Sequence, residues 1–338
     1  MPLVPYLHRV ANRENLSPEE AFDAMLAILE GKATTAQIAA FLVALRMKGE
    51  TSGEILGFAR AMREKSNRVD VGLPGETLLD TCGTGGDGGG TFNVSTVTAF
   101  VVAGAGVRVA KHGNRSLSSQ CGSADVLEEL GVDIAMTPER AAAAIRDVGI
   151  GFLFAPAIHP AMKHAQPARA ELKMRTAFNL LGPLTNPAGA TAQLIGAPSV
   201  QAAELMAQAL AGLGVDRAMV VHGSDGLDEI TTTGSTVVFA VRGTEVVREE
   251  VRPEDFGVAV ARVEDLRGGD RKRNAEIAME VLSGGGGAKR DIVLVNAAAA
   301  LVVGGKAGGW RGGMELAEGS IDSGEALKRL RGLARLRL

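Results

Sequence analysis

The segment 81–96, TCGTGGDGGGTFNVST, contains the residues whose spacing points most directly to chemistry. Its glycines leave backbone N–H groups unshielded and able to adopt positive φ, as a backbone nest that binds anions requires. Ser95 and Thr96 stand where a helix is expected to begin, so their hydroxyl groups and amides converge on one point. The segment predicts a phosphate or pyrophosphate site, and a surface loop without a ligand is the alternative.

The same segment also matches a dinucleotide-binding pattern. GTGGDG at 83–88 fits G-x-G-x-x-G, but in that fold the helix begins within the glycines and an acidic residue about 20 positions later binds the ribose. Here GGTFNV (89–94) comes before the helix, and the next strand ends at Ala110 and Lys111 without an acid. The sequence therefore disfavours a dinucleotide.

A second polar cluster, residues 111–130, follows an expected strand. Lys111, His112 and Arg115 place three potential cations within five residues. Ser123 is expected to cap the helix that follows. Side chains that form hydrogen bonds lie between, namely Asn114, Ser116, Ser118 and Ser119. A single basic residue is most often solvated, but basic residues in a turn with glycine, beside a second glycine-rich turn, favour a polyanion.

A third cluster, HGSDGLDEI at 222–230, contains Asp225, Asp228 and Glu229 and also follows an apolar strand. Carboxylates are hard oxygen ligands suited to Mg²⁺. A solvated acidic turn is the ordinary explanation for this motif taken alone. Because pyrophosphate is commonly bound together with Mg²⁺ held by one or two carboxylates, the neighbouring clusters favour a metal site here.

A fourth stretch, residues 169–187, combines cations with apolar residues. Arg169, Lys173 and Arg175 fall near helical spacing, and a solvated helix face explains them equally well. An apolar wall for a flat substrate is expected from Phe178, Leu180, Leu181 and Pro183. Cys82 and Cys121 have no base or second ligand at a useful spacing, so we interpret both as packing residues.

These clusters must be positioned by the elements around them, and beyond residue 76 short apolar strands alternate with helices. Such alternation predicts parallel pairing in a layered α/β sheet, whose ligands bind outside the carboxyl ends of the strands. Residues 166–190 interrupt the alternation and are expected to pack on the N-terminal helices. The expected strands are 77–80, 107–110, 151–154, 192–197 and 218–221, and expected helices begin at Thr137 and Ser199.

The first 65 residues predict only helices. Ser17 and Glu20 form a capping box around Pro18, and further helices are expected from Thr35 and from Thr51 or Ser52. Three short helices make a thin core, so their remaining apolar faces require the rest of the chain or a second subunit. The segment 66–76 has the composition of a linker.

Length and composition limit the class of protein. A chain of 338 residues predicts about two domains, and a net charge of −3 argues against a general binder of nucleic acids or membrane surfaces. Two cysteines exclude a disulfide scaffold and a four-cysteine zinc site, and fit a reducing cytosol. The apolar stretch 292–305 is too short to span a membrane, and the N-terminus does not fit a signal peptide. We expect a cytoplasmic α/β protein.

Six motifs in this order resemble the anthranilate phosphoribosyltransferase family of tryptophan biosynthesis. The likeness covers nearly the whole chain, and the motifs are GTGGD (83–87), NVST (93–96), KHGNR (111–115), CGSADVLE (121–128), RTAFNLLGPLTNP (175–187) and DGLDE (225–229). The resemblance implies a small helical domain (1–70, joined by about 166–190), a larger α/β domain with a mainly parallel sheet (75–165 and 191–338), and a homodimer through the N-terminal helices.

The resemblance also implies the roles of individual residues. Anthranilate would contact Gly83, Asn114 and Arg169, and Mg²⁺ would be held by Ser95, Asp228 and Glu229. The substrate 5-phosphoribosyl 1-pyrophosphate (PRPP) would be bound by Gly83, Gly86, Asp87, Thr91, Asn93, Val94, Ser95, Thr96, Lys111, His112, Gly113, Asn114, Arg115, Ser116, Leu117, Ser118, Ser119 and Ser123.

The implied reaction transfers the phosphoribosyl group of PRPP to the amine of anthranilate and releases pyrophosphate. An aromatic amine is already neutral at pH 7, so no dedicated acid or base is expected, and positioning and electrostatics carry the rate. Two alternatives remain open: a nucleoside phosphorylase of related fold, disfavoured by the GTGGD, NVST and GPLTNP segments, and a non-catalytic or nucleic-acid-binding relative. The second should be basic and lack Asp228 and Glu229, and this chain fits neither condition.

Overall fold

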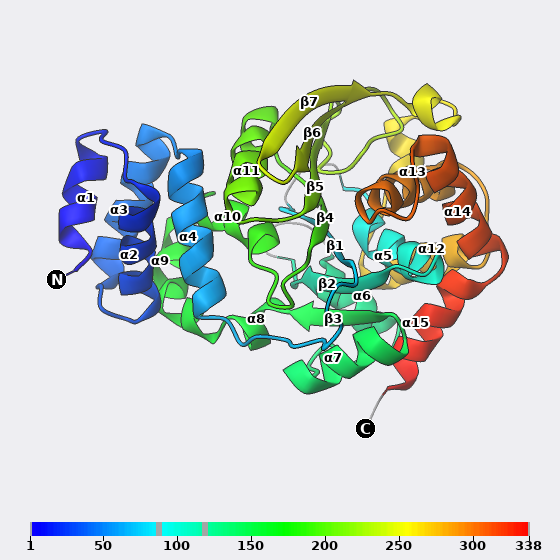
Figure 1. The fold of residues 1–338 in the computed structure, drawn as a ribbon, viewed down its shortest axis with the longest axis horizontal. Coiled ribbons are helices and arrows are strands. Elements are labelled where there is room, and N and C mark those ends of the chain that lie inside the picture. The colour runs from blue at the N-terminus through cyan, green and yellow to red at the C-terminus, as the bar shows by residue number, and fades with distance from the viewer. Residues whose placement is uncertain (1, 86–89, 117–120, 337–338) are drawn as a thin grey trace.

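One mixed sheet lies at the centre of the computed structural model, which describes residues 2–85, 90–116 and 121–336. Its strands are β1 (Leu78–Gly83), β2 (Arg108–Gly113), β3 (Ile150–Phe154), β4 (Ala192–Gly196), β5 (Arg217–Gly223), β6 (Thr236–Arg242) and β7 (Glu245–Val251). They lie in the order β3-β2-β1-β4-β5-β6-β7 (Figure 1). Neighbours among β1 to β5 are parallel, which confirms the mainly parallel sheet, whereas β6 pairs antiparallel with both β5 and β7.

Two features of the sheet differ from the sequence prediction. The hairpin of β6 and β7 was missed, because a pattern of alternating strands and helices does not reveal an antiparallel addition at the edge. Strand β2 also continues past Ala110, where the apolar run ends, and pairs Lys111 with Phe152 and His112 with Leu153 of β3. Both polar residues are buried, so apolar character alone marked the end of this strand too early.

The N-terminal helices are α1 (Val4–Ala11), α2 (Pro18–Leu29), α3 (Thr35–Lys48) and α4 (Ser52–Glu64). The predicted capping box of Ser17 and Glu20 is present, and Thr34 and Thr51 cap α3 and α4 in the same way. Helix α1 was not predicted; its Val10 is buried in the core of this bundle. The bundle forms the blue lobe at one end of the molecule (Figure 1).

Helices cover both faces of the sheet, and successive strand residues belong to different cores. Leu194 of β4 packs in the core that contains residues of α5, α13 and α14, whereas Ile195 packs with residues of α11 and the N-terminal helices. These helices are α5 (Val94–Gly104), α11 (Val200–Gly212), α12 (Arg271–Leu282), α13 (Ala288–Val303), α14 (Trp310–Asp322) and α15 (Glu325–Arg335). The predicted helix from Ser199 is therefore confirmed as α11, capped by the Ser199 side chain.

Shorter elements complete the chain: the helices α6 (Ser123–Glu129), α7 (Pro138–Asp147), α8 (Ala155–Ile158), α9 (Gln166–Leu172) and α10 (Phe178–Leu181), and the 3₁₀ helices η1 (Pro160–His164), η2 (Gly182–Leu184), η3 (Pro253–Phe256) and η4 (Val263–Leu266). Helix α9 packs on α3, and α10 packs on α4. Arg63 of α4 donates a hydrogen bond of 2.8 Å from Nε to the Leu184 carbonyl. No helix in the described part of the chain has the length and apolar character needed to cross a membrane.

Candidate anion and metal site

The N-terminus of α5 meets the acidic turn after β5. The Ser95 amide donates a hydrogen bond of 3.0 Å to Oε1 of Glu229, and the Gly85 amide donates one of 2.8 Å to Oδ2 of Asp228. Two clusters that lie far apart in the sequence are therefore joined at the carboxyl ends of β1 and β5, as the parallel sheet predicted.

Gly83 is where the acidic turn approaches β1 most closely. A Cβ atom at this position would lie 2.4 Å from Oδ2 of Asp228, a separation that a real side chain does not tolerate. The sequence analysis assigned this glycine to ligand contacts. The structure gives it a further role, since only glycine lets the Asp228 carboxylate reach the Gly85 amide.

Asp228, Glu229 and Ser95 together offer two carboxylates and a hydroxyl group, a hard donor set of the kind that Mg²⁺ prefers. Within residues 2–85, 90–116 and 121–336, no three His, Cys, Asp or Glu side chains are grouped as they would be in a metal site built by protein alone. Asp225 is committed elsewhere, because its Oδ2 accepts hydrogen bonds from Thr231 and Thr233 at 2.6 and 2.5 Å.

Lys111 brings a buried cation to the same point. Its ammonium group donates 2.6 Å to the Thr81 carbonyl and lies 3.5 Å from Oγ of Ser95. Burial lowers the pKa of Lys111, while Asp80 acts in the opposite direction. Lys111 therefore lies at the first turn of α5, beside the predicted anion nest.

His112 faces a different environment from Lys111, because side chains alternate along a strand. Its Nδ1 lies 3.1 Å from the Gly182 carbonyl, and its ring contacts that of His159 at 5.1 Å. Burial lowers the pKa of His112 to about 3, with a further contribution from His159. The prediction that His112 adds a cation to the second polar cluster of the sequence, residues 111–130 (the basic loop), is therefore wrong.

The buried histidine pair predicts a dependence of stability on pH. Burial also lowers the pKa of His159 to about 4, so both rings are neutral in the folded chain while the unfolded chain binds protons below a pKa of about 6.5. Stability is therefore complete above pH 6.5 and declines as the pH falls toward the folded values. As the pH falls from 7 to 5, each of the two histidines should lower the free energy of unfolding by about 2 kcal/mol.

Urea unfolding followed by the fluorescence of Trp310 at both pH values measures this effect. His159→Gln should flatten the dependence, and His8→Gln on the exposed face of α1 should leave it unchanged. Asp80 opposes the trend, because burial raises its pKa to about 6 and its ionisation destabilises the fold as the pH rises. A midpoint in the unaltered chain that does not fall between pH 7 and pH 5 would contradict the assignment.

Sequence reasoning missed the buried polar residues that hold these loops in place. Asp80 accepts hydrogen bonds from the His112 amide at 3.1 Å and from Nδ2 of Asn186 at 2.8 Å. Asn296 of α13 accepts from the Ile230 amide at 3.0 Å and donates to the Ile230 carbonyl at 2.9 Å, which fixes the backbone next to Glu229. For Asn296 the available signal was a polar residue inside an otherwise apolar run, whereas Asp80 stands only at the end of a short one.

The glycine-rich segment is held from its other end by two asparagines. Asn93 donates 3.1 Å to the Cys121 carbonyl and accepts 3.0 Å from Asn274 of α12. Thr91 forms a bridge with Arg267. Helix α5 begins at Val94, before the predicted start, and the side chains of Val94 and Thr96 are buried.

In the basic loop, Ser123 is the first residue of α6 rather than its cap, and Gly122 precedes it as the N-cap. The Ser123 hydroxyl instead accepts from the Asn114 amide at 3.2 Å and donates to the Asn114 carbonyl at 3.3 Å. The Cβ that Gly113 lacks would lie 2.2 Å from the same hydroxyl. The predicted residues Gly86, Asp87, Leu117, Ser118 and Ser119 lie outside the described residues.

Arg169 lies on α9 and is half-buried, with its guanidinium 5.2 Å from the centre of the Phe178 ring. Burial lowers its pKa, and its guanidinium has no hydrogen-bond partner among the described residues. Its partial burial against Phe178 disfavours the alternative of a solvated helix face for this residue. Lys173 and Arg175 do not continue the helix, because α9 ends at Leu172 and Lys173 adopts a left-handed conformation. Arg175 turns to the glycine-rich segment, where its Nη2 lies 3.2 Å from the Gly85 carbonyl.

The expected apolar wall is only partly available to a ligand. Leu181 and Pro183 are buried among the helices of the N-terminal core, and Leu180 is half-buried. Phe178 is 5% exposed and lies against Arg169. Cys82 and Cys121 are buried free thiols, as predicted.

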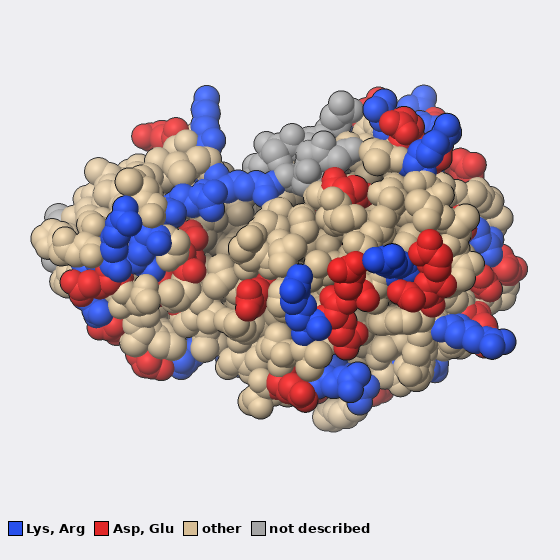
Figure 2. Space-filling model, turned by 90° about the horizontal axis from the view of Figure 1, so that it is seen from above, with Lys and Arg blue, Asp and Glu red and all other residues tan. Residues whose placement is uncertain are grey.

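Charges on the surface agree with the low net charge. Figure 2 shows basic and acidic side chains of the described residues interspersed on the face seen from above. A concentrated field of one sign, as a nucleic-acid binder uses, is not seen on this face.

Two family models match the chain. The model described as "Glycosyl transferase family, helical bundle domain" matches residues 4–66, and "Glycosyl transferase family, a/b domain" matches residues 75–327. A curated anthranilate phosphoribosyltransferase from Solibacter usitatus is 64% identical over 99% of this chain and 98% of its own.

Solved structures show the same relationship. The anthranilate phosphoribosyltransferase of Thermus thermophilus has a TM-score of 0.92 and 43% identity over 99% of both chains. The Saccharomyces cerevisiae enzyme in complex with PRPP and Mg has a TM-score of 0.90 and 31% identity over 98% of this chain and 97% of its own. Another structure of the yeast enzyme, in complex with 4-fluoroanthranilate, has a TM-score of 0.88 and 30% identity, with 98% and 96% covered. The chain described here belongs to the anthranilate phosphoribosyltransferase family.

Proposed function

We propose that this protein transfers the phosphoribosyl group of PRPP to the amine of anthranilate, giving N-(5-phosphoribosyl)anthranilate and pyrophosphate. This is the second step from chorismate in tryptophan biosynthesis. The observation that carries the proposal is the pair of hydrogen bonds from Ser95 and Gly85 to Glu229 and Asp228, in a chain 64% identical to a protein of that name. These bonds join an anion nest to a pair of carboxylates, as a pyrophosphate leaving group requires.

PRPP binds between the glycine-rich segment and the basic loop. The amino end of α5 supplies backbone dipoles, and Lys111 lies directly beside it. Further residues proposed to bind PRPP come from β1, from the segment before α5, from the segment after β2 and from the start of α6: Gly83, Thr91, Asn93, Asn114, Ser116 and Ser123. Asp228, Glu229 and Ser95 hold Mg²⁺, which when bound neutralises charge on the departing pyrophosphate.

Positioning carries the reaction. The amine of anthranilate attacks C1 of the ribose while the C1–oxygen bond to pyrophosphate breaks, and the leaving group gains charge as it departs. Fixed amides at α5 stabilise that charge more strongly than they stabilise bound substrate. Arg169 holds the carboxylate of anthranilate and leaves its amine free to attack.

The test of function mixes the protein with PRPP, Mg²⁺ and anthranilate and follows the loss of anthranilate fluorescence. Turnover that requires both substrates supports the proposal. Phosphorolysis of a pyrimidine nucleoside, in the absence of anthranilate turnover, would instead assign the chain to the related phosphorylases.

The domain division follows the packing contacts. Residues 1–70 together with about 166–190 form the helical domain, supported by the contact of α9 with α3 and the hydrogen bond from Arg63 to Leu184. Residues 75–165 and 191–338 form the α/β domain that binds PRPP. Arg169 thus belongs to the helical domain and the carboxylates belong to the other, so residues of both domains contribute to the proposed site.

A homodimer forms through the N-terminal helices. Helix α3 carries an apolar stripe at helical spacing that the chain leaves exposed or half-buried: Ala36, Ala40, Val43 and Met47. Met47 is 73% exposed and continues this stripe, and a contiguous exposed apolar surface is typical of a protein–protein interface.

Met47→Lys and Val43→Lys should each yield monomers, because a charge buried at an apolar interface without a partner is strongly unfavourable. Size-exclusion chromatography with light scattering measures the mass. Val247→Lys, at a partly exposed apolar position on β7, is the matched control and should not change the mass. A dimer that persists through substitutions along the whole stripe places the interface elsewhere.

A further inference from the structure

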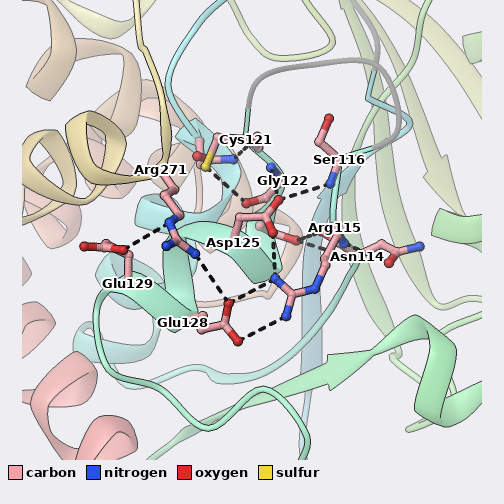
Figure 3. Close-up of polar contacts among 11 residues, drawn as sticks. Asn114, Arg115, Ser116, Cys121, Gly122, Asp125, Glu128, Glu129 and Arg271 are labelled. Carbon is pink, nitrogen blue, oxygen red and sulfur yellow. Dashed lines mark hydrogen bonds and ion pairs between the residues drawn. The ribbon is translucent and has the colours of Figure 1, made fainter.

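Asp125, in the first turn of α6, joins two parts of the basic loop. Its Oδ2 accepts hydrogen bonds from the Gly122 amide at 2.9 Å and from the Ser116 amide at 3.3 Å. Figure 3 shows the carboxylate between these two residues, with Arg115 on its other side. One oxygen atom therefore joins the backbone at Ser116 to the backbone at Gly122.

Gly122 makes this approach possible. A Cβ atom there would lie 2.3 Å from the Ser116 amide nitrogen and 2.6 Å from the Asn114 carbonyl oxygen. Ser123 adds two hydrogen bonds to the Asn114 backbone. The segment 114–116 is thus fixed against the start of α6 by backbone contacts that other residue types at 122 would prevent.

The second carboxylate oxygen holds Arg115. Nη1 of Arg115 donates hydrogen bonds of 2.8 Å to Oδ1 of Asp125 and 3.0 Å to Glu128. Nη2 of Arg115 donates one of 3.1 Å to Glu128. Arg271 of α12 pairs with Glu129 at 3.4 Å and approaches Glu128 at 4.0 Å. Although burial raises the pKa of Asp125, the hydrogen bonds from Gly122, Arg115 and Ser116 lower it below its usual range, so the carboxylate is ionised at neutral pH.

We propose that Asp125 is a positioning residue for PRPP binding, and that Arg115 acts through Asp125 and Glu128 as a brace for the segment 114–116. The inference rests on the proposed function. Ordering a residue costs conformational entropy. A segment that is braced before the substrate arrives does not take this cost from the binding free energy. The brace therefore affects PRPP affinity and leaves the chemical step unaltered.

Direct binding of PRPP in the presence of Mg²⁺, measured by calorimetry on the full chain, tests the brace. Asp125→Ala should raise the Kd for PRPP about tenfold, while kcat at saturating concentrations of both substrates stays within about twofold. Asp125→Asn keeps an acceptor for the two amides but turns an amide donor toward Arg115, so a smaller rise is expected. It remains informative if the alanine variant fails to fold.

Glu129→Gln is the matched control, because Glu129 lies on the same helix and pairs with Arg271 and not with Arg115. Its Kd should equal that of the unaltered chain. The double variant with Arg115→Gln and Asp125→Asn should bind PRPP no more weakly than whichever single variant binds it more weakly. Both substitutions remove the same interaction, the one between Arg115 and Asp125.

Additive losses in the double variant would mean that Arg115 contacts PRPP directly, and the brace would be wrong. An unchanged Kd in Asp125→Ala would also overturn it. Neither result is confused with failure of the proposed function, because in that case the unaltered chain itself would not bind PRPP.

Discussion

Replacing Asp228 and Glu229 with Asn and Gln should lower kcat/KM by at least about 100-fold, which corresponds to about 2.7 kcal/mol of lost transition-state stabilisation. The amide side chains keep acceptors for Gly85 and Ser95, so the loops remain joined. What disappears is the negative charge that we propose to hold Mg²⁺ at the leaving group. The variant should also require a higher Mg²⁺ concentration for half-maximal activity.

A titration of activity against Mg²⁺, run with the Asp228 and Glu229 double variant and with the unaltered chain, separates an effect on metal binding from an effect on folding. Glu249→Gln with Glu250→Gln removes the same charge from an exposed adjacent pair on β7 and should change neither quantity. Near-normal turnover of the Asp228 and Glu229 double variant at ordinary Mg²⁺ would remove both carboxylates from the mechanism.

Arg169→Ala should lower kcat/KM for anthranilate by roughly 10- to 150-fold, the loss expected when a charge-assisted contact worth about 1.5–3 kcal/mol is removed from a desolvated site. The planar guanidinium matches a carboxylate on a flat ring, and Phe178 holds it in place from one face. Its burial strengthens the expectation, because a half-buried cation without a hydrogen-bond partner among the described residues gains most from an anionic ligand.

The effect should be selective for one substrate. Steady-state kinetics with each substrate varied in turn should show a raised KM for anthranilate and an almost unchanged KM for PRPP. Lys163→Ala removes an exposed cation from the neighbouring η1 and serves as the control. Equal losses for both substrates, or an unchanged KM for anthranilate, would end the assignment.

Local sequence was sufficient for those features that depend on neighbouring residues. The capping box at Ser17 and Glu20 is formed as predicted, because its hydrogen bonds span one helical turn. The parallel strands were recognisable from short apolar runs between helices, and parallel topology places their carboxyl ends together. The joining of Glu229 to Ser95 follows from that topology.

Features that depend on burial were not recognisable in this way. Lys111 and His112 are adjacent cationic types, yet one lies beside the anion site and the other is neutral against His159. Successive side chains of β2 point to opposite faces of the sheet, which separates Lys111 from His112. Only the packing of η2 and of His159, next to η1, buries the His112 ring away from solvent. Desolvation, which sets the protonation state, has no local signature in the sequence.

Hydrogen bonds between segments far apart in the chain were also not recognisable from the sequence. The sequence predicted Arg115 as a cation for the substrate, whereas Arg115 pairs with Asp125 and Glu128. It left a single helix face open for Arg169, Lys173 and Arg175, whereas α9 ends at Leu172. By itself the sequence determined the α/β class, the family and the clusters that meet at the sheet's edge, because these follow from local patterns and motif order. Only the tertiary structure decided which of those polar groups are buried, paired or left for a ligand, because partners and solvent exposure are set by contacts between segments far apart in the chain.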